Sequence, residues 1–128
     1  MIAVLIHYEV LSLLSRALPR FNCQRRILVL IGVIGALIAH VLEVILFGLT
    51  YYVLIRWWDV GTLAGNLDGT FFDCVYFSFT TFTTLGFGDI EPDGYIRMLV
   101  GLEALTGLVL ITWSASFMFI EMQKFWQR

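Results

Sequence analysis

Charged side chains are scarce in this chain: only 14% of its 128 residues are Asp, Glu, Lys or Arg, and the net charge is −2. Proteins that bind nucleic acid gather lysine and arginine on one face, and the eight basic residues here form no such face. The sequence therefore predicts no nucleic-acid partner.

Cysteines and catalytic motifs are also few. The two cysteines, Cys23 and Cys74, fit no metal-binding or redox spacing, and we interpret them as unpaired packing residues. The sequence has no paired nucleophile and base, no phosphate-binding loop and no cluster of metal ligands. We expect neither an enzyme nor a protein that takes a small-molecule substrate.

Hydrophobic residues, by contrast, make up 59% of the chain, and the mean hydropathy is +0.86. They are gathered in two runs, residues 27–55 and residues 95–120, each longer than the roughly 20 residues that cross a bilayer core. A chain of this length is expected to form one domain. The sequence thus predicts an all-α membrane protein with an outer helix and an inner helix over these two runs.

The first 20 residues differ from the two runs. Glu9, Ser12 and Arg16 share one face of a predicted helix whose remaining residues are mostly aliphatic. We expect residues 1–20 to form an amphipathic helix lying in the membrane interface, with a short additional span as the alternative. The stretch lacks a basic leader, so a cleaved signal peptide is not expected.

Lysine and arginine are distributed unevenly around the two predicted spans. Six lie before the outer helix or after the inner helix and two flank the connection: Arg16, Arg20, Arg25, Arg26, Lys124 and Arg128, against Arg56 and Arg97. The positive-inside rule then predicts that both termini, including a short tail over residues 121–128, are cytoplasmic. We expect a multi-pass protein of the cell (inner) membrane whose acidic connection faces outside.

The connection contains a mostly apolar stretch over residues 71–83. It is too short to span a bilayer and fits a re-entrant helix surrounded by protein. Asp68 and Thr70 are candidate N-caps, and Asp73 would lie in the first turn, where a carboxylate is favourable. Non-helical backbone at membrane depth is tolerated only where it is buried or lines water, so residues 84–88 are expected to line a wet space.

The loop after this helix carries the string TTLGFGD, Thr83 to Asp89. Gly86 and Gly88 alternate with larger residues, and glycine adopts positive φ readily, so successive carbonyls can point the same way. A ring of such carbonyls can replace the hydration shell of a cation. The string closely resembles the selectivity filter of potassium channels. The order of outer helix, pore helix, filter and inner helix resembles the two-transmembrane prokaryotic potassium channels.

The resemblance implies a homotetrameric pore in the lipid bilayer, because one filter strand cannot surround an ion. It implies a filter over residues 84–88, ending at Gly88, with K⁺ sites formed by the Thr84 hydroxyl and by four carbonyls: those of Thr84, Leu85, Gly86 and Phe87. K⁺ is then the transported ion, and no cofactor is expected.

The resemblance also identifies residues that would support the filter. Phe87 replaces the tyrosine commonest at that position, and Thr80 stands where some relatives carry a glutamate. Tyr76 is expected to hydrogen-bond Asp89. Glu103 is expected to brace the filter from behind by bonding hydroxyls or amides near Thr80, Thr81 or Thr83, with a bond to the outer helix, such as to His40, as the rival.

Residues of the inner helix are candidates for the gate. Gly107 lies where the family often keeps a hinge glycine, although a close-packing role is an equal alternative. Four residues at three-to-four spacing would face the cavity or inner gate, or else pack against neighbours: Leu108, Ile111, Ala115 and Phe119. His40 and Glu43 share a helix face and are candidates for pH sensing, with a structural hydrogen bond as the alternative.

The predicted function is therefore a potassium-selective channel that conducts K⁺ passively. One alternative is a channel that conducts cations without selecting K⁺, that is, a general cation pore. Another is a non-conducting membrane subunit that regulates a partner.

Overall fold

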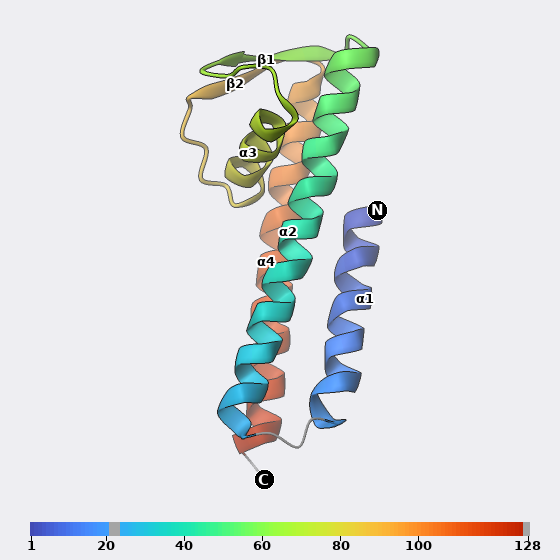
Figure 1. Cartoon of the computed structure of the whole chain (residues 1–128), viewed down its shortest axis with the longest axis vertical. Coiled ribbons are helices and arrows are strands. Elements are labelled where there is room, and N and C mark those ends of the chain that lie inside the picture. The colour runs from blue at the N-terminus through green and yellow to red at the C-terminus, as the bar shows by residue number, and fades with distance from the viewer. Residues whose placement is uncertain (21–23, 127–128) are drawn as a thin grey trace. The chain divides into compact units, whose positions relative to one another are not determined.

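The computed structural model describes residues 1–20 and 24–126, and the chain divides into two compact units. Unit 1 comprises residues 1–43 and 110–128, and unit 2 comprises residues 44–109. Two long helices, α2 (Arg25–Trp57) and α4 (Ile96–Trp126), contribute residues to both units (Figure 1).

Among the described residues, three helices are long and apolar enough to cross a membrane: Ile2–Arg20, Arg26–Trp57 and Ile96–Lys124. The second and third contain nearly all of the runs expected to be the outer and inner helices. Helix α4 continues through residues 121–126, where a separate tail was expected, and residues 127–128 lie outside the described part of the chain.

Unit 1 contains α1 (Ile2–Ala17), the short helix η1 (Leu18–Arg20) and parts of α2 and α4. His7 of α1 contacts Glu43 of α2, and a Cβ atom built on Gly35 would meet the side chain of Leu14. Residue numbers rise along α1 as they fall along α2, so the two helices run antiparallel, side by side (Figure 1).

The buried residues of α1 are spaced four apart, as Ala3, His7 and Leu11, and form a stripe suited to helix packing. Within unit 1 this stripe lies against α2. The expectation that residues 1–20 lie in the membrane interface stays a prediction, as does its alternative, a short additional span, which the length and composition of Ile2–Arg20 allow.

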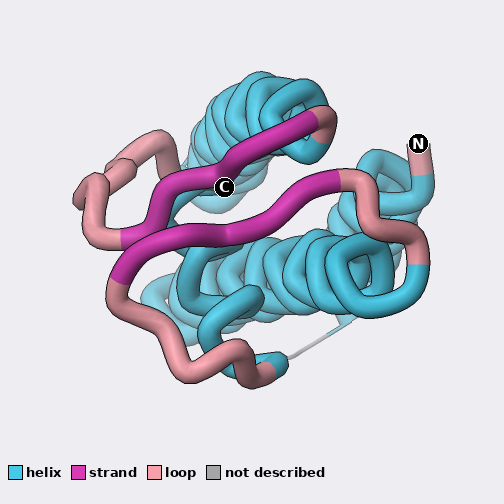
Figure 2. The backbone as a smooth tube through the Cα atoms, turned by 90° about the horizontal axis from the view of Figure 1, so that it is seen from above, coloured by secondary structure: helices cyan, strands magenta, loops and turns pink. Residues whose placement is uncertain are grey.

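Unit 2 contains the remaining parts of α2 and α4 together with α3 (Phe71–Phe82) and two strands, β1 (Gly61–Gly65) and β2 (Ile90–Gly94). The strands pair antiparallel from Gly61↔Gly94 to Gly65↔Ile90 (Figure 2). The fold is therefore mostly helical and not all-α. The strands escaped sequence-based prediction because both contain residues that are rare in strands, Gly61 and Gly65 in β1 and the run Pro92–Gly94 in β2.

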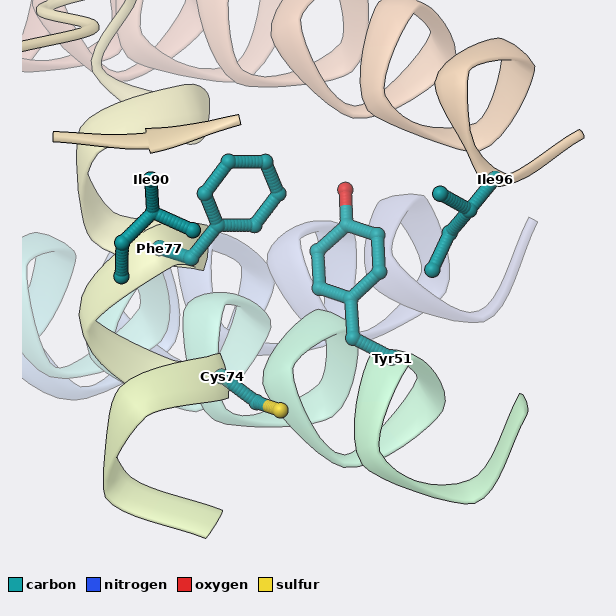
Figure 3. Packing of buried hydrophobic residues seen from close by; sticks show 5 residues of the cluster. All are labelled: Tyr51, Cys74, Phe77, Ile90 and Ile96. Atoms are coloured by element: carbon teal, nitrogen blue, oxygen red, sulfur yellow. The ribbon is translucent and has the colours of Figure 1, made fainter. Parts of the chain in front are cut away.

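A hydrophobic cluster joins four elements of unit 2. Its buried residues are Tyr51 of α2, Cys74 and Phe77 of α3, Ile90 of β2 and Ile96 of α4 (Figure 3). The rings of Tyr51 and Phe77 meet edge to face with centroids 5.3 Å apart. Cys74 is confirmed as a buried packing residue, and Cys23 lies outside the described residues.

The start of α3 is held by a capping box, which confirms Thr70 as the N-cap. The Thr70 amide donates to the Asp73 carboxylate at 2.8 Å, and the Asp73 amide donates to the Thr70 hydroxyl at 3.3 Å. Hydrogen bonds from the Thr70 backbone and side chain hold the pKa of Asp73 below its usual range. The stabilisation is complete above the ordinary Asp pKa and is lost as the pH falls through the lowered value.

Replacing Thr70 with alanine is expected to lower the stability of the folded chain by about 1 kcal/mol, because an N3 amide loses its partner. Thermal unfolding of the purified chain in detergent measures the effect. Thr106→Ala is the matched control, since that hydroxyl bonds only to a carbonyl of its own helix. Equal melting temperatures for the two variants would show that the capping box does not stabilise α3.

Candidate functional site

The GFG loop, defined as residues 83–89, leaves α3 with an alternating backbone conformation. Thr84, Gly86 and Gly88 have φ angles of 58°, 50° and 77°, whereas the residues between them do not have positive φ. This alternation is the pattern needed for successive carbonyls to align. Thr84 is β-branched, so its positive φ costs on the order of 1–3 kcal/mol and persists only where surrounding contacts hold it.

Main-chain hydrogen bonds tie the GFG loop to the end of α3. The Thr84 amide donates to the carbonyl of Thr81 at 2.9 Å, and the Gly86 amide donates to the carbonyl of Thr80 at 3.0 Å. The Thr80 hydroxyl donates to the carbonyl of Phe77 in its own helix. Thr80 therefore contacts the loop through its backbone carbonyl.

The other end of the loop is tied by a side-chain bond. The Tyr76 hydroxyl of α3 donates to the Asp89 carboxylate at 2.8 Å. This confirms the expected hydrogen bond, while its role in supporting a filter stays a prediction. Both groups are exposed in the single chain, so the bond lies at a surface of unit 2.

Glu103 of α4 is fully buried and bonded from two other helices. The Tyr51 hydroxyl of α2 donates to one carboxylate oxygen, and the Ser78 hydroxyl of α3 contacts the other. Ser78 Oγ also lies 2.9 Å from the carbonyl of Val44. A hydroxyl has one hydrogen, so Ser78 serves these two acceptors in turn.

The partners of Glu103 correct the expected ones. The carboxylate does reach α3, but at Ser78, and not at Thr80, Thr81 or Thr83. It also bonds the outer helix, at Tyr51 where His40 was named. The sequence gives the position of Glu103 along α4. Its partners on neighbouring helices depend on how each helix is rotated about its own axis.

Gly107 lies where α4 touches the end of α3. A Cβ atom at this position would collide with the backbone carbonyl of Phe82. Gly48 of α2 has the same relation to Val75, whose Cα would lie 2.9 Å from such an atom. Of the two interpretations of Gly107, close packing therefore has a direct structural cause, and the hinge role stays a prediction.

The four inner-helix residues expected to face a cavity or gate are exposed in the single chain. Leu108, Ile111 and Phe119 expose 52%, 38% and 60% of their surface, and Ala115 is also exposed. Such exposure suits a face that meets water, lipid or another copy of the chain. Their role at a gate stays a prediction.

Unit 1 contains a second buried polar group, the His–Glu cluster of His7, His40 and Glu43. The Glu43 carboxylate bonds His7 Nδ1 at 2.9 Å through one oxygen and His40 Nδ1 at 3.0 Å through the other. The i,i+3 pair was expected, but His7 was missed. An ionisable residue in an apolar helix was the available signal. The sequence argument found no group of metal ligands, whereas one ligand atom from each of these three residues lies within 4.8 Å of the other two.

A groove of about 430 Å³ lies along one side of the GFG loop. Its walls include Thr84, Gly86 and Gly88 of the loop, and Val100 and Ala104 of α4. The apolar side chains of Leu85 and Phe87 are 58% and 64% exposed in the single chain. Unit 2 thus presents both a groove and unburied apolar side chains next to the strained loop.

Known proteins are similar to this chain in sequence. A profile described as ion channel matches residues 39–124. The "TWiK family of potassium channels protein 18" of Caenorhabditis elegans is 37% identical over 79 residues, which cover 61% of this chain and 14% of that protein. This chain thus matches a small part of that relative's length. No solved structure matches the chain significantly.

Alanine substitutions at two glycines of α4 are expected to have opposite effects. Gly107→Ala should lower stability by about 1–3 kcal/mol, because the new methyl group collides with backbone. Gly101→Ala should raise stability by roughly 0.5–1 kcal/mol, because open space surrounds that position and alanine favours the helix. Thermal unfolding of both variants tests this, and stabilisation by Gly107→Ala would contradict the close contact with Phe82.

Removing the carboxylate of Glu103 is expected to destabilise the fold strongly. Glu103→Val leaves the Tyr51 hydroxyl buried without an acceptor, at a cost of about 1–3 kcal/mol. Glu103→Gln should be milder, because the amide can accept from Tyr51 and donate to Ser78. Adding Tyr51→Phe to Glu103→Val should restore part of the lost stability. Strictly additive effects in thermal unfolding would contradict the shared bond.

Proposed function

The chain belongs to the ion channel family, and from this premise we propose that it conducts K⁺ passively through a pore lined by the GFG loop. Membership of this family makes the chain a membrane channel protein and not an enzyme. The observation that carries the proposal is the backbone alternation at Thr84, Gly86 and Gly88. It supports a row of aligned carbonyls, which is the chemistry that replaces the hydration shell of a cation.

In the proposal, the ion sites are the carbonyl oxygens of Thr84, Leu85, Gly86 and Phe87, with the Thr84 hydroxyl at the inner end. Helix α3 ends next to these residues, and the partial negative charge of a helix C-terminus favours a cation there. The carbonyls of Thr80 and Thr81 accept hydrogen bonds from loop amides, and these bonds hold the strained loop in place. A site made this way selects by the number and geometry of its oxygens.

The proposed pore is a homotetramer around a central axis, because one GFG loop cannot surround an ion. Two observations on unit 2 support assembly through this region. The side chains of Leu85 and Phe87 are largely exposed in the single chain, and the groove beside the loop has room for side chains of another copy. Burying these apolar groups between copies would favour assembly.

The proposed orientation in the membrane is based on the distribution of lysine and arginine around the two predicted spans. The connection between α1 and α2 and the C-terminal end of α4 face the cytoplasm, and the strands of unit 2 face outside. Helix α1 has 16 residues, so Met1 lies about 24 Å along the helix axis from that connection, at a rise of about 1.5 Å per residue. The cytoplasmic N-terminus expected from the sequence stays a prediction.

Flux measurements separate the proposal from its alternatives. The purified chain is reconstituted alone in liposomes, and K⁺ and Na⁺ fluxes are compared. K⁺ flux far above Na⁺ flux is expected. Equal fluxes would favour a general cation pore, and no flux from a correctly assembled tetramer would favour a non-conducting regulatory subunit. Chemical cross-linking before reconstitution reports the assembly.

Gly86→Ala is expected to reduce K⁺ flux at least about tenfold while the tetramer still assembles, because left-handed φ costs a residue with a Cβ roughly 1–2 kcal/mol in each copy. Gly69→Ala is the matched control. Gly69 also has positive φ, at 74°, and open space around it, but it lies outside the GFG loop. Flux that falls equally in both variants would count against the loop as the ion path.

A further inference from the structure

We propose that the His–Glu cluster of His7, His40 and Glu43 is a binding site for a divalent first-row transition metal, of which Zn²⁺ is the representative. This site lies within unit 1, and nothing in the channel proposal requires it. It also departs from the sequence-based expectation that the protein carries no cofactor.

The positions of the ligand atoms fit a metal ion. One ligand atom from each of His7, His40 and Glu43 lies within 4.8 Å of the other two. The two Nδ1 atoms lie 2.9 Å and 3.0 Å from different oxygens of the Glu43 carboxylate. Ligands bound tetrahedrally at about 2.0–2.1 Å are separated by roughly 3.3 Å. Coordination would therefore draw the most widely spaced ligand atoms together by up to about 1.5 Å.

The chemistry of the donors selects the class of metal. Two imidazole nitrogens and one carboxylate oxygen suit borderline transition metals, whereas Ca²⁺ and Mg²⁺ prefer sites made only of oxygen. Two histidines and one glutamate are also a ligand set that holds zinc elsewhere, with the fourth position open. The cluster thus offers three protein ligands of the type that transition metals prefer.

The surroundings of His7 suit a ligand imidazole. Ser114 Oγ of α4 lies 3.4 Å from His7 Nε2, on the side of the ring that faces away from Glu43. A hydroxyl there can accept the Nε2 proton, which leaves Nδ1 free to bind a metal. The ring of Trp113 packs beside His7 with centroids 5.3 Å apart and restrains its rotation.

The three ligands differ in burial. His7 and Glu43 are fully buried, while the side chain of His40 is 16% exposed. His40 and Glu43 lie on one face of α2, and His7 comes from α1. A bound metal would therefore link α1 to α2 by coordinate bonds.

A direct titration tests the site on the full chain, purified in detergent with a histidine-free tag and stripped with a chelator. Co²⁺ is added as the spectroscopic probe, and Zn²⁺ is then added as the competitor. We expect saturation at one Co²⁺ per chain, with visible absorption that Zn²⁺ removes. His7→Gln and His40→Gln should each weaken Co²⁺ binding by at least about tenfold.

Three controls assign the binding to these residues. Glu9→Gln removes an exposed carboxylate of α1 outside the cluster and should leave Co²⁺ binding unchanged. Cys23→Ala/Cys74→Ala should also bind Co²⁺ normally, because the proposed ligands include no sulfur. X-ray absorption at the zinc edge of the wild-type chain should show imidazole nitrogen at about 2.0–2.1 Å and no sulfur near 2.3 Å.

The zinc-edge measurement identifies the ligand atoms in the wild-type chain, so it tests the proposal even if a histidine variant fails to fold. Absence of saturable Co²⁺ binding to the wild-type chain would overturn the proposal and leave the cluster as a hydrogen-bonded group. Sulfur ligands at the zinc edge, or full binding in His7→Gln/His40→Gln, would overturn it as well.

Discussion

The carboxylate of Glu103 is the point at which the helices of unit 2 meet. It is fully buried on α4, and hydroxyl groups from α2 and α3 bond its two oxygens. A buried carboxylate without partners would be very unfavourable, so the rotation of each helix is restricted to the one that brings Tyr51 and Ser78 to it. The hydrophobic cluster of unit 2 joins the same three helices and β2, and the close contact at Gly107 joins α4 to α3. Hydrophobic packing holds these helices together, and the polar bonds determine how they face one another.

The GFG loop depends on that arrangement. A threonine with positive φ and two glycines in the left-handed region form a loop that would relax if it were free. Backbone bonds to Thr80 and Thr81 at one end and the Tyr76–Asp89 bond at the other keep it in place. All of these partners lie on or next to α3, whose start is fixed by the Thr70 capping box. The strain in the loop is thus balanced by contacts on a short, well-capped helix.

Unit 1 also contains a buried carboxylate, but its hydrogen-bond partners are of a different kind. Glu43 is as buried as Glu103, but its partners are two imidazoles in place of two hydroxyls. Hydroxyl groups can only share hydrogen bonds with a carboxylate, whereas imidazole nitrogens can also ligate a metal. Glu43 of unit 1 is a ligand in the proposed metal site, whereas Glu103 belongs to unit 2, which contains the proposed ion path.

The sequence by itself determined the features that depend on local pattern. Hydropathy located α2 and α4, and the length of the apolar stretch at 71–83 predicted a short helix. Its N-cap was narrowed to Asp68 or Thr70, and the string TTLGFGD predicted the alternating loop. Tertiary structure decided the rest. The partners of Glu103, the contact of Gly107 with Phe82, the pairing of β1 with β2 and the meeting of His7 with Glu43 all join residues at least 25 positions apart. Such contacts depend on how helices rotate and on how segments pair, and neither hydropathy nor spacing within one segment specifies that.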